Sequence, residues 1–244
     1  MELIRTDGVI KNHDRFKLGP VDLSLSQGEA LGIMGPAGAG KTTLTRLMWG
    51  FLRPDEGDIS MLLFPPYPHY VTVRRAVGYL PAEPRFYEWM TPLEHFDFVS
   101  KFYFQWIPER AMDALERLGI DPKERIYRMS AGDRRKVALA AAVAHNPVVL
   151  LLDEPTTGVE FGDRADILAF VRHFLENPHV GAIVCSDISE DLDKLATVVL
   201  MLNAGRVVEY GTVSALANHY GHDRMEAIFR EASARRDNRK KRLE

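Results

Sequence analysis

A short glycine-rich run in this sequence reads Gly35-Pro36-Ala37-Gly38-Ala39-Gly40-Lys41-Thr42-Thr43. It satisfies the pattern G-x-x-x-x-G-K-[ST], and it lies between an apolar strand-like run, Ala30 to Met34, and a helix-like segment, Lys41 to Gly50. The glycines let successive backbone N–H groups point at one place, and the N-terminus of the following helix favours an anion there. The run therefore predicts a cradle for the phosphates of a nucleoside triphosphate.

Two side chains of the run have specific chemistry. The Lys41 ammonium supplies a point charge for the β- and γ-phosphates, and the Thr42 hydroxyl is placed to ligate Mg²⁺. We expect the ligand to be ATP with Mg²⁺, contacted by the whole segment from Gly35 to Thr43.

A second candidate site follows the apolar run Val148 to Leu152, which ends on the acidic pair Asp153-Glu154. Open α/β sheets bind ligands at the carboxyl ends of their strands, so this pair is expected beside the phosphate cradle. Asp153 is suited to hold Mg²⁺ through water, and Glu154 is suited to orient or deprotonate an attacking water.

Bulk properties limit the function classes. A chain of 244 residues with 46% hydrophobic residues fits one large α/β domain or a core with an inserted subdomain. The net charge of −3 argues against a general polyanion binder, so we expect no nucleic-acid partner. One cysteine, Cys185, excludes an internal disulfide. No apolar run approaches the ~20 residues that cross a bilayer, so any work at a membrane requires a separate spanning chain.

The order of patterns predicts a mostly parallel sheet, because strand-like and helix-like segments alternate. Expected strands cover 30–34, 148–152, 182–186 and 198–202, and short strands surround a proline-rich turn within 58–80. Expected helices cover 41–50, 132–145 and 162–175, and 92–128 is expected to be helical with loops near Pro108 and Pro122. The central helical block indicates an insertion. The basic run Arg235 to Arg242 is expected to be a solvated, frayed terminus, with contact to anionic lipid or a partner as the alternative.

The order of motifs resembles the nucleotide-binding subunit of ABC transporters over roughly residues 1–215. Besides the two phosphate-side motifs, the resemblance rests on three segments, which correspond to the signature, the D-loop and the Q-loop region: Met129-Ser130-Ala131-Gly132-Asp133-Arg134-Arg135-Lys136-Val137, Pro155-Thr156-Thr157-Gly158-Val159-Glu160, and Gly78-Tyr79-Leu80-Pro81-Ala82-Glu83-Pro84. The aromatic segments Phe86–Thr91 and Phe102–Trp106 are similar to the branch that serves small two-component exporters.

The resemblance implies a RecA-like P-loop NTPase core (α/β) with an antiparallel β subdomain and an inserted α-helical subdomain. It places the core and β subdomain at 1–84 and 148–220, the helical subdomain with the signature at 85–147, and a basic tail at 221–244. It also implies a dimer, with itself or with a second ABC ATPase, in which Ser130 and Gly132 cap the γ-phosphate bound to the opposite chain. A membrane permease is the implied partner, at the cytoplasmic face of the membrane, with export favoured.

Several positions depart from the family pattern. Ala82 stands for the Q-loop glutamine, Ala131 and Asp133 replace a glycine and a glutamine of the signature, Glu160 replaces the D-loop aspartate, and Asp187 replaces the switch histidine. Asp187 matters most, because an ionised aspartate ~4 Å from the γ-phosphate costs about 4 kcal/mol at an effective dielectric near 20.

Two hypotheses remain open: a working ATPase with an unusual switch and slow turnover, or the degenerate regulatory partner of a heterodimer. A non-transport ABC protein acting on ribosomes or DNA is disfavoured, because such chains carry two ATPase units or long coiled-coil arms.

Two aromatic predictions complete the site. Phe16, with His13 second, is the candidate platform for the adenine ring. Tyr87, Trp89 and Met90 are the candidates for a groove that receives a helix of the permease.

Overall fold

The centre of the fold is a six-stranded sheet, in a computed structural model that describes residues 1–13, 16–67 and 70–241. The strands are ordered β5 (Val77–Leu80), β6 (Val149–Asp153), β7 (Gly181–Ser186), β3 (Ala30–Met34), β8 (Val198–Asn203) and β9 (Arg206–Thr212). The first five run parallel and β9 pairs antiparallel with β8. The prediction of a mostly parallel sheet is confirmed.

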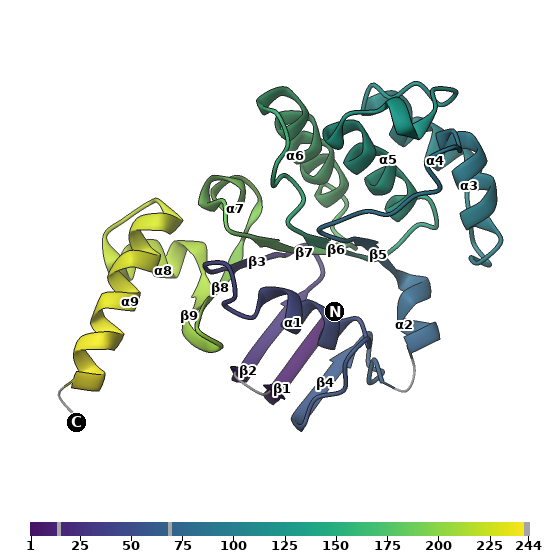
Figure 1. The fold of residues 1–244 in the computed structure, drawn as a ribbon. Coiled ribbons are helices and arrows are strands. Elements are labelled where there is room, and N and C mark those ends of the chain that lie inside the picture. Colours follow the sequence, from purple (N-terminus) through teal and green to yellow (C-terminus); the bar gives the residue numbers. More distant parts are fainter. Residues whose placement is uncertain (14–15, 68–69, 242–244) are drawn as a thin grey trace.

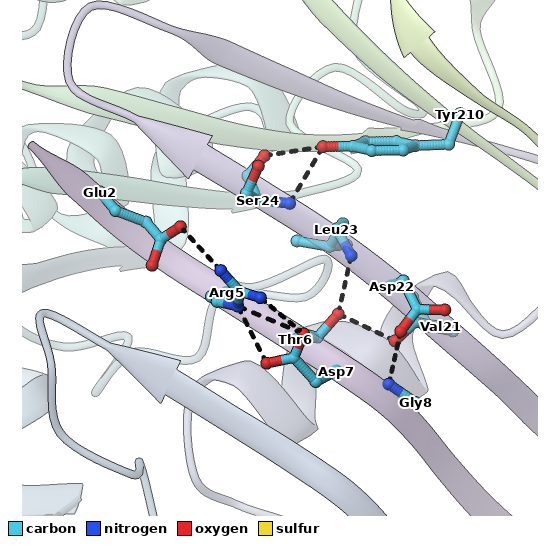
Figure 2. Close-up of polar contacts among 10 residues, drawn as sticks. All are labelled: Glu2, Arg5, Thr6, Asp7, Gly8, Val21, Asp22, Leu23, Ser24 and Tyr210. Carbon is cyan, nitrogen blue, oxygen red and sulfur yellow. Dashed lines mark hydrogen bonds and ion pairs between the residues drawn. The ribbon is translucent and has the colours of Figure 1, made fainter.

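A second, three-stranded antiparallel sheet consists of β2 (Phe16–Ser26), β1 (Glu2–His13) and β4 (Glu56–Met61), in that order. Figure 2 shows how its polar contacts are arranged: the Thr6 hydroxyl donates to the Val21 carbonyl at 3.0 Å and accepts from the Leu23 N–H at 3.1 Å. The Tyr210 hydroxyl of β9 bonds both the N–H and the carbonyl of Ser24, each at 3.0 Å. These two bonds join the small sheet to the large one.

Two hydrophobic layers cover the large sheet, because its buried strands alternate side chains between faces. In β6, Leu150 and Leu152 face the layer of the helical segment, whereas Val149 and Leu151 face the layer of the small sheet. Figure 1 shows α3, α4, α5 and α6 on one side of the sheet, and α1 with the small sheet on the other. The helices are α1 (Lys41–Met48), α2 (Tyr70–Ala76), α3 (Pro92–Ser100), α4 (Pro108–Arg117), α5 (Ala131–Val143), α6 (Phe161–Leu175), α7 (Ser189–Leu195), α8 (Val213–Tyr220) and α9 (Met225–Lys241), with a 3₁₀ turn at Ile126–Arg128.

Two sequence predictions are wrong. The segment 58–80, expected to hold short strands, contains helix α2. Val73 of this helix is only 1% exposed, so packing against the core overrides the β preference of its valines. The basic run from Arg235 is not frayed as far as Lys241, because it continues α9, whose earlier residues Met225, Ile228 and Ala232 are buried at helical spacing. Its contact with solvent, lipid or a partner stays a prediction. Residues 242–244 lie outside the described residues.

The helical segment 85–147 contains α3, α4, the 3₁₀ turn and α5. Its status as a subdomain, and the division into 1–84 with 148–220, 85–147 and 221–244, stay predictions. Within the described ranges, the longest helices lack the length and apolar character that a bilayer crossing demands.

Candidate functional site

Three loops meet at the carboxyl edge of the parallel strands. The glycine-rich loop follows β3, Asp153 ends β6 with Glu154 directly after it, and Asp187 follows β7. Strand β7 lies between β3 and β6, with Met34 opposite Ser186 and Asp153 opposite Cys185. Strand order alone therefore brings the predicted phosphate, metal and switch residues to one place.

The glycine-rich loop has the geometry of a phosphate cradle. Gly38 and Gly40 adopt left-handed backbone conformations, with φ of 77° and 108°. Gly40 is the residue before α1, so this turn leads directly into the helix N-terminus. A side chain at Gly40 would also clash, because its Cβ would lie 2.9 Å from Leu18 Cδ1 and from Phe16 Cζ. Glycine is required here on both counts.

The donor set for a divalent cation is present at the start of α1. The Thr42 hydroxyl lies 3.5 Å from Asp153 Oδ1, so a hydroxyl and a carboxylate face each other between helix and strand. Burial and the neighbouring Glu154 charge raise the pKa of Asp153. Two hard oxygen donors fit Mg²⁺, and a cation there would offset the cost of burying the Asp153 charge.

Glu154 is held by three donors. Its Oε1 lies 3.1 Å from Lys41 Nζ, and its Oε2 accepts from the Thr157 hydroxyl at 2.8 Å and from the Asp187 N–H at 3.3 Å. Lys41 also donates to the Gly35 carbonyl at 2.7 Å. The backbone of Glu154 has φ of 50°, which is unusual for a residue with a side chain and costs of order 1–3 kcal/mol. The structure thus brings Lys41 and Glu154 together, as the sequence predicts.

Asp187 lies beside Glu154 and is exposed. Its contribution to the site in this structure is its backbone N–H rather than its carboxylate. Ala82 lies half-buried in the loop after β5, and Glu160 is exposed directly before α6.

The signature residues are arranged differently from the prediction of a free anion site. Ser130 and Asp133 form a reciprocal capping box at the start of α5: the Ser130 hydroxyl donates to Asp133 Oδ2 at 2.8 Å and accepts from the Asp133 N–H at 2.9 Å. Gly132 is buried, and a Cβ there would collide with the carboxylate of Asp163. The role of Ser130 and Gly132 toward a phosphate stays a prediction, and it requires Asp133 to release the Ser130 hydroxyl.

Phe16 lies against the phosphate loop at the first residue of β2. A Cβ added at Gly40 would lie 2.9 Å from Phe16 Cζ, and the His13 ring lies 6.1 Å from the Phe16 ring, centroid to centroid. The platform for adenine therefore stays a prediction with a suitable location.

Sequence reasoning missed the groups that support Glu154. Thr157 donates to its carboxylate, and Arg135 of α5 donates to the carbonyls of Glu154 and Thr157, each at 2.9 Å. Asp191 of α7 is 0% exposed, accepts from the Thr156 hydroxyl, and pairs with Arg164 Nε at 2.8 Å. Asp191 stands in a run of polar residues that reads as a surface helix, so the sequence carries no signal of its burial.

The sequence has close counterparts. Residues 18–157 match the family described as "ABC transporter". The chain is 32% identical over 235 residues to the daunorubicin resistance ATP-binding protein DrrA3 of Streptomyces coeruleorubidus, which covers 94% of this chain and 74% of that protein. It is 30% identical over 215 residues to the ABC transporter ATP-binding protein NatA of Bacillus subtilis, which covers 86% of this chain and 87% of that protein.

Solved structures agree in fold. One, described as the ATP-binding subunit of an ABC transporter, superposes with a TM-score of 0.85 at 21% identity, covering 95% of this chain and 99% of the other. A dimeric ATP-binding cassette in a post-hydrolysis state, bound to ADP and phosphate, gives a TM-score of 0.77 at 20% identity, covering 86% and 98%. The fold is that of a RecA-like P-loop NTPase. Because most of its length aligns with named ATP-binding proteins, the chain belongs to the ABC transporter family as an ATP-binding subunit.

Proposed function

We propose that this chain binds MgATP in the loop Gly35–Thr43 and hydrolyses it slowly at a site completed by a second ABC ATPase chain. The observation that carries the proposal is the contact between Lys41 and Glu154 at 3.1 Å, at the edge where Asp153 and Thr42 also meet. This contact supports hydrolysis because the Lys41 ammonium, which would bind phosphate, and Glu154, the candidate general base, lie within one site.

Each residue has a defined task in the proposed reaction. Lys41 leaves Glu154 to contact the β- and γ-phosphates, which frees the Glu154 carboxylate to accept a proton from the attacking water. The water oxygen bonds to the γ-phosphorus, the bond from that phosphorus to the β,γ-bridging oxygen breaks, and ADP leaves with the electron pair. Thr42 and Asp153 would hold Mg²⁺, which neutralises charge on the phosphates.

The direct test is phosphate release by the purified chain with MgATP, compared with the variants Lys41→Ala and Glu154→Gln. We expect measurable release by the unmodified chain, loss of ATP affinity in Lys41→Ala, and loss of turnover without any loss of affinity in Glu154→Gln. Equal release by all three proteins refutes the proposal.

A second candidate function is that of a regulatory partner in a heterodimer, which binds ATP and turns it over poorly. Two carboxylates favour it: Asp187 at the switch position, and Asp133, which accepts a hydrogen bond from the Ser130 hydroxyl. The loss of one well-placed catalytic hydrogen-bond donor typically lowers the rate by ~10²–10³. The variant Asp187→His separates the two candidates, because it should raise turnover if the switch limits the rate and leave it unchanged if the chain is regulatory for other reasons.

The proposed membrane partner is a permease, engaged through the aromatic surface that precedes α3. Trp89 is 64% exposed and Tyr87 is 45% exposed, with their rings 5.0 Å apart, whereas Met90 packs partly against the core. Exposed aromatic pairs of this kind are typical of protein interfaces. Export is the proposed direction, supported by relatives named for resistance to daunorubicin and linearmycin, although another relative is named for sulfate import.

A further inference from the structure

The turn from Glu154 to Thr157 is held by its backbone as well as by its side chains. The Thr157 N–H points back to the Glu154 carbonyl at 3.4 Å, and the Thr157 hydroxyl donates to Glu154 Oε2 at 2.8 Å. The orientation of the Glu154 carboxylate therefore depends on the shape of this turn, whose first residue already has the unfavourable φ of 50°.

The Arg135 side chain forms hydrogen bonds with both ends of that turn. Arg135 donates from Nη1 to the Glu154 carbonyl and from Nη2 to the Thr157 carbonyl, each at 2.9 Å. The planar fork of a guanidinium fixes the separation and direction of two acceptors in a way that a lysine cannot. Burial lowers the pKa of Arg135, and the opposing effect of the nearby Glu154 and Glu83 charges only partly offsets it.

Arg135 belongs to a different structural unit from the turn that it holds. It lies in the first turns of α5, the helix that starts at the Ser130 cap. Its neighbours on α5 point elsewhere: Arg134 pairs with Glu88 at 3.0 Å beside the aromatic surface, and Lys136 pairs with Asp163 and Asp166 of α6, each at 2.7 Å. Consecutive side chains of one helix thus connect the surface segment, the Glu154 turn and α6.

We propose that Arg135 is a positioning residue that ties the orientation of Glu154 to the position of α5. A displacement of α5, which carries the 86–90 segment with it through Arg134 and Glu88, moves the two donors of Arg135 relative to the turn. The Glu154 carboxylate then turns away from the reacting water. This inference rests on the proposed hydrolysis and names the residue that links the helical segment to it.

The test compares three variants of the full chain with MgATP as the substrate. Arg135→Met removes both donors and keeps most of the side-chain volume. Arg135→Lys restores one donor and the charge. Arg134→Met is the matched control, because it removes an adjacent arginine of the same helix that does not bond the Glu154 turn.

We expect kcat of Arg135→Met to fall roughly 10- to 100-fold, as for a misplaced catalytic group, with KM and ATP affinity within about 2-fold. Arg135→Lys should recover part of kcat, and Arg134→Met should match the unmodified chain. The inference is overturned if Arg135→Met keeps its kcat, if it loses ATP affinity in parallel with kcat, or if Arg134→Met loses as much.

A readout without turnover separates this inference from the proposed function. Amide hydrogen exchange in the peptide covering 154–160 should be faster in Arg135→Met than in Arg134→Met, because the turn opens more often without its two donors. If the unmodified chain releases no phosphate, the proposed function fails and exchange alone decides: equal exchange in the two variants refutes the role of Arg135.

Discussion

The contact between Lys41 and Glu154 makes a quantitative prediction for the variant Glu154→Gln. In the structure the two side chains are 7% and 16% exposed and their charged atoms lie 3.1 Å apart. ATP needs Lys41 for its phosphates, so binding must break or share this contact. A substitution that weakens the contact without removing the side chain should therefore strengthen nucleotide binding while it removes the base.

The magnitude follows from the kind of hydrogen bond that is exchanged. Hydrogen bonds to charged groups contribute about 1.5–3 kcal/mol, and replacing the Glu154 carboxylate by a neutral amide leaves only the Lys41 charge, which moves the contact from the upper to the lower part of that range. The difference of about 1 kcal/mol corresponds to roughly 5-fold in Kd, since 1.4 kcal/mol is tenfold. Removing the repulsion between the carboxylate and the γ-phosphate acts in the same direction. Turnover should fall by ~10²–10⁴, as for a lost general base.

The assay is calorimetric titration with MgATP, in parallel with phosphate release. The matched control is Glu176→Gln, because Glu176 is a surface carboxylate, 68% exposed, whose partner is His173. We expect tighter ATP binding in Glu154→Gln and no change in the control. An unchanged or weaker Kd in a folded Glu154→Gln variant would show that the Lys41 contact does not compete with the nucleotide, and the reasoning would be refuted.

Three further predictions concern the loop, the aromatic surface and pH. Gly40→Ala should weaken ATP binding by about tenfold, because a φ of 108° costs of order 1–2 kcal/mol for a residue with a Cβ and because that Cβ would contact Phe16. Calorimetric titration measures the affinity, and Gly162→Ala is the control, since a Cβ at Gly162 would have nothing within 4 Å. Trp89→Ala should weaken co-purification with the permease and leave ATP affinity unchanged. The control Tyr67→Ala changes another exposed aromatic residue, 49% exposed, and should affect neither property. A large loss of ATP affinity in Trp89→Ala would show that Trp89 is a structural residue. Burial lowers the pKa of His95 and of His145 from 6.5 to about 4, so the unfolded chain binds these protons first and the free energy of unfolding should fall as pH drops from 6.5 toward 4. Urea denaturation at pH 7.5 and 5 measures it, and a His145→Gln variant with an undiminished loss would contradict the assignment.

The sequence alone determined the local chemistry and the fold class. The glycines before Lys41 permit the left-handed backbone conformations of a phosphate cradle, and an apolar strand that ends on Asp153-Glu154 has to deliver those carboxylates to the same sheet edge. Both patterns are short-range, so they can be read without knowledge of the rest of the chain.

Only the tertiary structure decided which side chains support that chemistry. Arg135, in the basic run 134–136, and Asp191, in a short polar helix, look like surface residues, and each reaches the site through contacts with residues at least 19 positions away in the chain. Helix α2, whose Val73 joins the core beneath the small sheet, and α9, which packs against β9 and α7, likewise depend on other parts of the chain. Such contacts are long-range and are set by how the elements pack, so residue type and periodicity do not predict them. The sequence therefore predicts the glycine-rich loop and the Glu154 carboxylate, whereas the orientation of that carboxylate is a property of the packed molecule.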